Sequence, residues 1–174
     1  PTFFTLNVLQ TIPSLALFSI LIPLIAALLA LFPTLKEAGI GAIGSTPALI
    51  ALTIYSILPV ARNTYTGLRT VDSAIIEAAR GMGMTPLERL LKVELPIASP
   101  IILGGVRIAL VQAIGLTAVA ALIGAGGMGT FIFLGIGQSA DDLILLGALP
   151  TVLVALIADG AMQGMIKIVK PKGI

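Results

Sequence analysis

The sequence has no cysteine, no histidine and no tryptophan in 174 residues, and only 10% of its residues are charged. Without cysteine, disulfide bonds and thiolate metal sites are excluded. Without histidine, the commonest catalytic base and metal ligand is missing. A formal net charge of +2 gives no support for nucleic-acid binding. A membrane enzyme built on clustered nucleophiles, bases or metal ligands is therefore a poor hypothesis.

Most residues of the chain are apolar. They make up 57% of the chain, and the mean hydropathy is +1.13. A soluble domain carries about a quarter charged residues, because water must wet its surface. This chain has too little charge to cover a globule. Its outer surface must face lipid.

Four apolar runs are long enough to cross a membrane, since a transmembrane helix needs roughly 20 mostly apolar residues. They cover about 6–32, 46–66, 96–123 and 142–165. Internal prolines and 19 glycines favour kinked helices in close contact. We expect an all-α, polytopic bundle of about four transmembrane helices, forming one domain over 1–174. The uncharged start is not a signal peptide, and we expect a further hydrophobic segment upstream in the native protein.

The positions of lysine and arginine predict the orientation. With the polar stretch at about 70–95 in the cytoplasm, alternation of the spans places nine of the ten basic residues on that side, and only Lys36 opposite. An excess of basic residues marks cytoplasmic loops. The nine are Arg62, Arg69, Arg80, Arg89, Lys92, Arg107, Lys167, Lys170 and Lys172.

The cytoplasmic loop contains the signals of two short helices. Asp72 or Ser73 can cap a first helix over 74–80, and Gly81 and Gly83 can end it. An ordinary interfacial loop is the alternative for an arbitrary membrane protein.

Thr85 begins the second helix of the loop. Glu88 stands three residues later, which is the spacing of a capping box, and Pro86 occupies the first helical position. Glu88 and Lys92 form a favourable i,i+4 pair. Because Pro96 disfavours helix at the residue before it, we expect a break between this helix and the next span.

A longer motif runs through this loop. Its residues are Glu77, Ala78 and Ala79, then Gly83, Val93, and finally Leu95 and Pro96. The pattern resembles the EAA loop of ABC importer permeases and departs from it only at Val93, where the family has isoleucine. The resemblance implies a coupling loop that docks into a groove on a cytoplasmic ATP-binding subunit. Small residues would permit close docking there, and Glu77 would meet a basic group.

Three further stretches, 10–17, 58–68 and 123–129, are similar to the osmoprotectant branch of this family, which imports glycine betaine, carnitine, choline and related solutes. The resemblance implies no catalysis by this chain, with ATP and Mg²⁺ bound on the partner ATPase. It also implies a second permease subunit, as a homo- or heterodimer, and an extracytoplasmic substrate-binding protein or domain. No Gly-x-x-x-x-Gly-Lys-Ser/Thr motif for ATP occurs in the chain itself.

Polar residues within or beside the spans are candidates for a solute path. Aromatic residues that could hold a quaternary ammonium group are few, so tight recognition is expected on the separate binding protein. The path residues we expect are Asn63, Thr64, Tyr65, Gln112 and Thr117.

Arg107 and Asp159 are the ionisable residues inside the spans. Buried charges in membranes usually pair or line a watery path. We expect both in the cytoplasmic third of the bundle, facing each other or a vestibule. The alternative is that each reaches the inner interface separately.

The glycine-rich segment 124–137 contains a Gly-x-Gly-x-x-Gly pattern. Without a preceding strand and a following acidic residue this is a weak nucleotide signal. We expect a tight turn before a short interfacial segment over 130–134, serving as an external gate, a docking surface or simple packing.

A secondary transporter driven by an ion gradient is the alternative to the ATP-driven importer. Such proteins usually show acidic residues at mid-bilayer and inverted repeats. Asp159 is the only candidate acid, and no clear internal repeat is visible.

Overall fold

The computed structural model describes residues 12–169, which form helices joined by short connections and contain no strand. This confirms the expected all-α fold. The helices are α2 (Ser14–Leu31), α3 (Thr34–Glu37), α4 (Ser45–Arg69), α5 (Ser73–Gly81), α6 (Pro86–Arg89), α7 (Leu95–Ala120), α8 (Gly129–Gln138) and α9 (Asp141–Val169), with a π-helical stretch over Leu90–Glu94 and a 3-10 turn over Ala121–Ile123.

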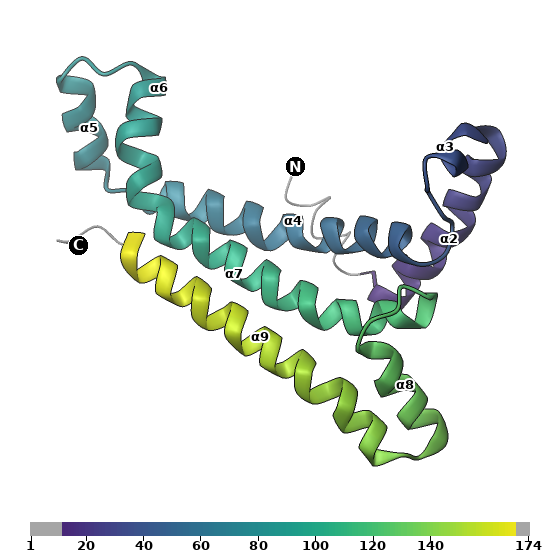
Figure 1. The fold of residues 1–174 in the computed structure, drawn as a ribbon. Helices are drawn as coiled ribbons and strands as arrows, with labels where there is room; N and C mark the ends of the chain where they lie inside the picture. Colours follow the sequence, from purple (N-terminus) through teal and green to yellow (C-terminus); the bar gives the residue numbers. More distant parts are fainter. Residues whose placement is uncertain (1–11, 170–174) are drawn as a thin grey trace.

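Three long helices form the body of the molecule. Figure 1 shows α4 and α9 on either side of α7, with α2 across one end and the α5–α6 hairpin projecting from the other. Glycine brings α4 and α7 together, because a Cβ at Gly105 would lie 2.6 Å from the Cβ of Asn63 and 2.7 Å from the carbonyl oxygen of Pro59. Small residues permit such contacts in membranes, where packing drives helix association.

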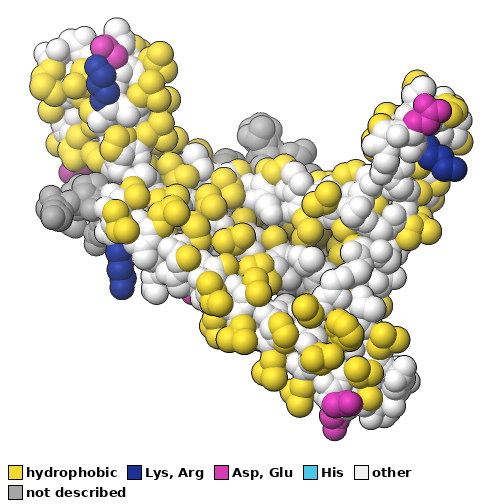
Figure 2. Space-filling model, in the orientation of Figure 1, with side chains coloured by type: hydrophobic (Ala, Val, Ile, Leu, Met, Phe, Trp, Pro, Cys, Tyr) yellow, Lys and Arg dark blue, Asp and Glu magenta, His cyan; other side chains and the backbone are white. Residues whose placement is uncertain are grey.

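Four helical stretches are long and apolar enough to cross a membrane: Ser14–Leu31, Ser45–Arg69, Pro86–Ile123 and Asp141–Val169. They match the four predicted runs, with the first run's beginning at 6–11 outside the described residues. On the face drawn in Figure 2, apolar side chains cover the lengths of the helices, and charged ones gather toward their ends. The exposed apolar side chains of α9, from Leu145 to Ile157, suit contact with lipid.

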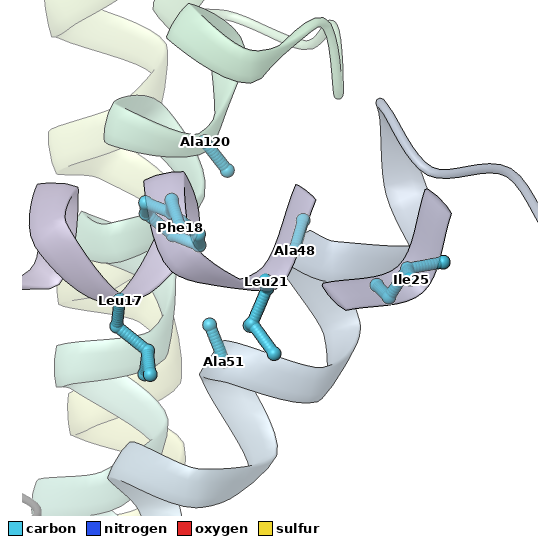
Figure 3. Packing of buried hydrophobic residues seen from close by; sticks show 7 residues of the cluster. All are labelled: Leu17, Phe18, Leu21, Ile25, Ala48, Ala51 and Ala120. Carbon is cyan, nitrogen blue, oxygen red and sulfur yellow. The ribbon is translucent and has the colours of Figure 1, made fainter. Parts of the chain in front are cut away.

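The best-buried apolar cluster joins α2 to the ends of α4 and α7. Phe18 is fully buried and lies among small side chains that let the helices approach (Figure 3). The cluster consists of Leu17, Phe18, Leu21 and Ile25 of α2, Ala48 and Ala51 of α4, and Ala120 of α7.

The predicted helix break at Pro96 is wrong. The second helix of the loop runs through it into α7, so that Pro86–Ile123 is one helix of 38 residues. A proline lacks the N–H of the α-helical bond and crowds the carbonyl four residues earlier. The π-helical stretch before Pro96 avoids that clash by pairing residues five apart, and the N–H of Leu95 donates to the carbonyl of Leu90.

The segment after the glycine-rich turn is also longer than expected. Helix α8 covers Gly129–Gln138 rather than 130–134. It then reverses at Ser139, which adopts a left-handed conformation with φ of 53°, and packs against α9. Gly135 permits this contact, because a Cβ there would lie 2.7 Å from the backbone nitrogen of Ile144.

Candidate functional site

The predicted first helix of the loop is present as α5, which covers Ser73–Gly81 and so is one residue longer at each end than the predicted 74–80. The Asp72 carboxylate accepts a hydrogen bond of 2.9 Å from the N–H of Ala74, so Asp72 is the cap rather than Ser73. After Gly81 the chain turns at Gly83, whose φ of +78° lies in the left-handed region that favours glycine. The turn sets α6 beside α5.

The predicted capping box of the second helix is formed. The Thr85 hydroxyl accepts from the N–H of Glu88 at 3.3 Å, and the Glu88 carboxylate accepts from the N–H of Thr85 at 3.0 Å. The same carboxylate lies 3.5 Å from Lys92. The Thr85 N–H above all, then its hydroxyl and Lys92, hold the pKa of Glu88 below its ordinary value. The loop is thus ordered by its own local bonds.

A second ion pair spans the π-helical stretch. Arg89 Nε donates to Glu94 Oε1 at 2.6 Å, and both side chains are mostly buried. The two residues are five apart, which is the spacing that brings side chains together on a π turn. This pair joins the loop to the start of α7.

The residues of the EAA-like motif divide into an inner and an outer set. Ala79 is 1% exposed and packs inside the loop, so its small side chain permits the hairpin rather than contact with another protein. Glu77, Ala78 and Pro96 are exposed, whereas Val93 and Leu95 are half-buried. Apolar side chains extend the outer surface of the loop, at Ile75, Met82, Leu87 and Leu91.

Two of the predicted path residues lie together. Asn63 of α4 and Gln112 of α7 line one cavity of about 410 Å³, along with Arg107 and Asp159. Asn63 Nδ2 also donates to the carbonyl of Pro59 at 2.9 Å, within its own helix. The remaining lining residues are Gly104, Ile108 and Val111 of α7.

The other three predicted path residues do not line this cavity. Thr64 donates to the carbonyl of Val60 at 2.8 Å, within α4. Tyr65 is 47% exposed, with the guanidinium of Arg69 5.2 Å from its ring centroid. Thr117 lines a different cavity of about 260 Å³ between α7, α8 and α9. Helical rotation separates them, because neighbouring residues point to different faces.

Arg107 and Asp159 face each other across α7 and α9. Arg107 Nη2 donates to Asp159 Oδ2 at 2.6 Å, and Arg107 Nε donates to Asp159 Oδ1. The side chains are 32% and 35% exposed. Arg107 lies near the middle of α7, and Asp159 lies in the C-terminal half of α9. Their depth in the cytoplasmic third of the bundle stays a prediction. Among the described residues, no group of three acidic side chains could hold a metal ion.

Tyr55 belongs to the same side of the bundle. It lines a second cavity, of about 500 Å³, together with Ser14 and Gln112, and its hydroxyl donates to the carbonyl of Ile12 at 2.6 Å. The cavity-lining residues of α7 recur at helical spacing: Gly104, Ile108, Gln112, Gly115 and Val119. The sequence carries little signal of this face, because α7 is apolar on all sides and these residues share no chemical character.

The glycine-rich segment forms a tight turn packed on its neighbours. Gly124 and Gly126 both have positive φ, and the carbonyl of Ile123 accepts from the N–H of Gly44 at 2.9 Å. At Gly129 a Cβ would lie 2.0 Å from the carbonyl oxygen of Ala118. The backbone therefore approaches α7 too closely for any other residue.

Comparison with known proteins identifies the family of the chain. Residues 2–172 match the family described as binding-protein-dependent transport system inner membrane component. The chain is 37% identical over 168 residues to the choline transport system permease protein OpuBB of Bacillus subtilis, covering 97% of this chain and 70% of that protein. It is 42% identical to the osmoprotectant import permease protein OsmW of Salmonella typhimurium, covering 97% and 73%.

Two further comparisons agree in family and fold. The glycine betaine/carnitine/choline transport system permease protein OpuCB of Bacillus subtilis is 38% identical over 168 residues, covering 97% of this chain and 70% of that protein. A chain of the MetNI methionine ABC transporter, solved in inward-facing conformations, superposes with a TM-score of 0.79 at 25% identity, covering 96% of this chain and 73% of that one.

Proposed function

Because the chain belongs to the family of binding-protein-dependent transport system inner membrane components, we propose that it carries an osmoprotectant through a path opened by a partner ATPase. It is a multi-pass protein of the cell membrane and the transmembrane permease subunit of an ATP-binding-cassette importer. In this proposal the whole chain, 1–174, works as one transmembrane domain.

The proposed substrate is a compatible solute with a quaternary ammonium group, such as glycine betaine, carnitine or choline. The named substrates of the similar permeases support it. So does the cavity beside α7, whose polar lining of Asn63, Gln112, Arg107 and Asp159 suits a small hydrophilic solute. An extracytoplasmic binding protein or domain would deliver the solute.

The observation that carries the coupling proposal is the continuous helix Pro86–Ile123. It begins in the loop, passes the cavity and ends at the glycine-rich turn. A rigid helix transmits a displacement of its cytoplasmic end to the side chains along it. In this proposal two ATPase subunits each dock on one loop, bind ATP and Mg²⁺, and pull the loops inward. The outer residues, Glu77 and Ala78, would contact the ATPase, and Gly83, Val93, Leu95 and Pro96 would shape the loop.

A second permease subunit completes the proposed path. The four apolar spans leave the cavity beside α7 open on one side, so a homodimer or heterodimer would enclose the solute. ATP binding would then face the path outward, and hydrolysis would return it inward. This chain would perform no catalysis.

Co-purification with the candidate ATPase subunit tests the loop. We compare the full-length wild type with Glu77→Arg and Gly83→Asp, using Asp142→Arg at the opposite end of the molecule as the control. Capture by the wild type and the control, lost in both loop variants while the permease elutes as a folded species, supports the proposal. Equal capture by all four proteins, or none by the wild type, contradicts it.

A further inference from the structure

Two adjoining cavities lie on one side of α7, and together they are called the groove here. The cavity lined by Asn63 and the cavity lined by Tyr55 share Gln112. Their residues on α7 follow each other at helical spacing, from Gly104 to Val119.

One ion pair lines this groove. The bonds from Arg107 to Asp159 use two of the five N–H groups of a guanidinium, so three remain to donate to a ligand. Each side chain is about one third exposed. Within the described part of the chain, these are the only two charged side chains that line a cavity described above.

We propose that Arg107 and Asp159 form a transient binding site for a zwitterionic solute in the path. The guanidinium of Arg107 receives the solute's carboxylate, and the carboxylate of Asp159 receives its quaternary ammonium group. The inference rests on the proposed function, because it assumes a solute with these groups.

Charge balance is the reason for a pair rather than a single charge. Opening an ion pair within the membrane-spanning bundle leaves two uncompensated charges, which is costly. A zwitterion brings the opposite charge to each partner at once, so the pair opens without leaving either one bare. When the solute departs, the two side chains pair again. The site is therefore easily emptied, as a transport path requires.

The solutes differ in a way that makes the site testable. Glycine betaine and carnitine carry a carboxylate, whereas choline carries only the ammonium group and a hydroxyl. Arg107 thus contributes to binding of the first two and not of the third. A pair that served only to hold α7 against α9 would treat all three alike.

Uptake into proteoliposomes containing the complete transporter tests the site. Glycine betaine and choline are supplied at several concentrations, and the ratio of their kcat/KM values is measured for wild type and Arg107→Gln. We expect the ratio of glycine betaine to choline to fall about tenfold, the effect of losing one charge-assisted hydrogen bond. Thr151→Val, which changes the separate cavity between α7, α8 and α9, is the control, and its ratio should equal that of the wild type.

A double variant separates binding from folding. Arg107→Met combined with Asp159→Leu replaces the pair by apolar side chains, a change that often preserves or raises stability. We expect this variant to keep its melting temperature and its ATPase assembly and to lose uptake of both solutes. Uptake at the wild-type rate by this variant would overturn the site and leave a packing role for the pair.

Two further outcomes distinguish a failure of the proposed binding site from a failure of the proposed function. A wild type that takes up neither solute with ATP would overturn the proposed substrate class, and the site with it. A wild type that takes up both, with Arg107→Gln lowering both by the same factor, would overturn the site alone. If the wild type takes up only one of the two solutes, uptake of that solute by the double variant tests the site.

Discussion

The close approach of α4 and α7 makes Gly105 sensitive to the smallest possible substitution. A Cβ there would lie 2.6 Å from the Cβ of Asn63 and 2.7 Å from the carbonyl oxygen of Pro59. Carbon atoms in contact prefer a separation of about 3.5–4.0 Å, so α4 would have to move outward by roughly 1 Å. One of the two atoms is backbone and cannot rotate aside.

We therefore expect Gly105→Ala to destabilise the protein by about 1–3 kcal/mol, the usual effect of overpacking. For a chain of this size the melting temperature falls by roughly 2–4 °C per kcal/mol. Gly104 is the matched control, because a Cβ there has no atom within 4 Å. Gly104→Ala should keep or slightly raise the melting temperature, since alanine favours helix more than glycine by about 1 kcal/mol.

Thermal unfolding of the purified permease in detergent compares the two variants. Because the residues are adjacent on one helix, the comparison cancels helix propensity and leaves only the contact with α4. Equal melting temperatures for Gly104→Ala and Gly105→Ala would refute the packing argument. The displaced Asn63 should also reduce solute uptake by Gly105→Ala, measured at a temperature where it is folded.

Three further predictions concern the core, the loop and the π-helical stretch. Phe18→Ala removes the fully buried ring that fixes α2 and should destabilise the protein by about 3–5 kcal/mol, seen as a lower melting temperature; an unchanged value would contradict the packing of α2. The pKa of Glu88 is lowered in the folded loop, so the capping box stabilises the loop above the unfolded pKa near 4.5 and loses that effect as pH falls through the lower folded pKa. ATPase capture by the wild type should therefore weaken in acid, and Thr85→Ala should abolish this pH dependence. Identical pH profiles of capture for the two proteins would contradict the argument. Pro96→Ala removes the reason for the π turn, so the residues before it should rotate relative to α7. We expect ATPase capture to persist and solute uptake per ATP hydrolysed to fall. An unchanged ratio of uptake to ATP hydrolysis would show that Pro96 is not the cause of the π turn.

Much of the architecture followed from hydrophobic and charged patterns alone. Lipid accepts apolar side chains and rejects charged ones, so the four spans were predicted near their observed bounds. Asp72, Thr85 and Glu88 predicted the two helices of the loop correctly, because a cap acts within a few residues and needs no distant partner.

The helix break predicted at Pro96 is absent because the backbone before the proline changes to π-helical hydrogen bonding. Proline opposes α-helix at its own position, but a change to π-helical bonding satisfies the backbone on both sides. Nothing in the few residues around Pro96 indicates that solution. The ion pair between Arg89 and Glu94, five residues apart, accompanies it in the folded structure.

The polar residues of the path were separated by the same kind of effect. Asn63, Thr64 and Tyr65 are neighbours in sequence, yet only Asn63 lines the cavity beside Arg107. Successive residues of a helix point about 100° apart, and the rotation of α4 decides which of them faces α7. The narrow contact at Gly105 sets that rotation.

The sequence by itself determined the membrane environment, the number of spans and the two caps of the loop, because each depends on composition or on bonds between near neighbours. The tertiary structure decided that the loop continues into α7 and that Arg107 meets Asp159 across two helices. It also decided which polar side chains share one groove. These features depend on how rigid helices rotate and approach in space, and their partners lie as far as 52 residues apart along the chain.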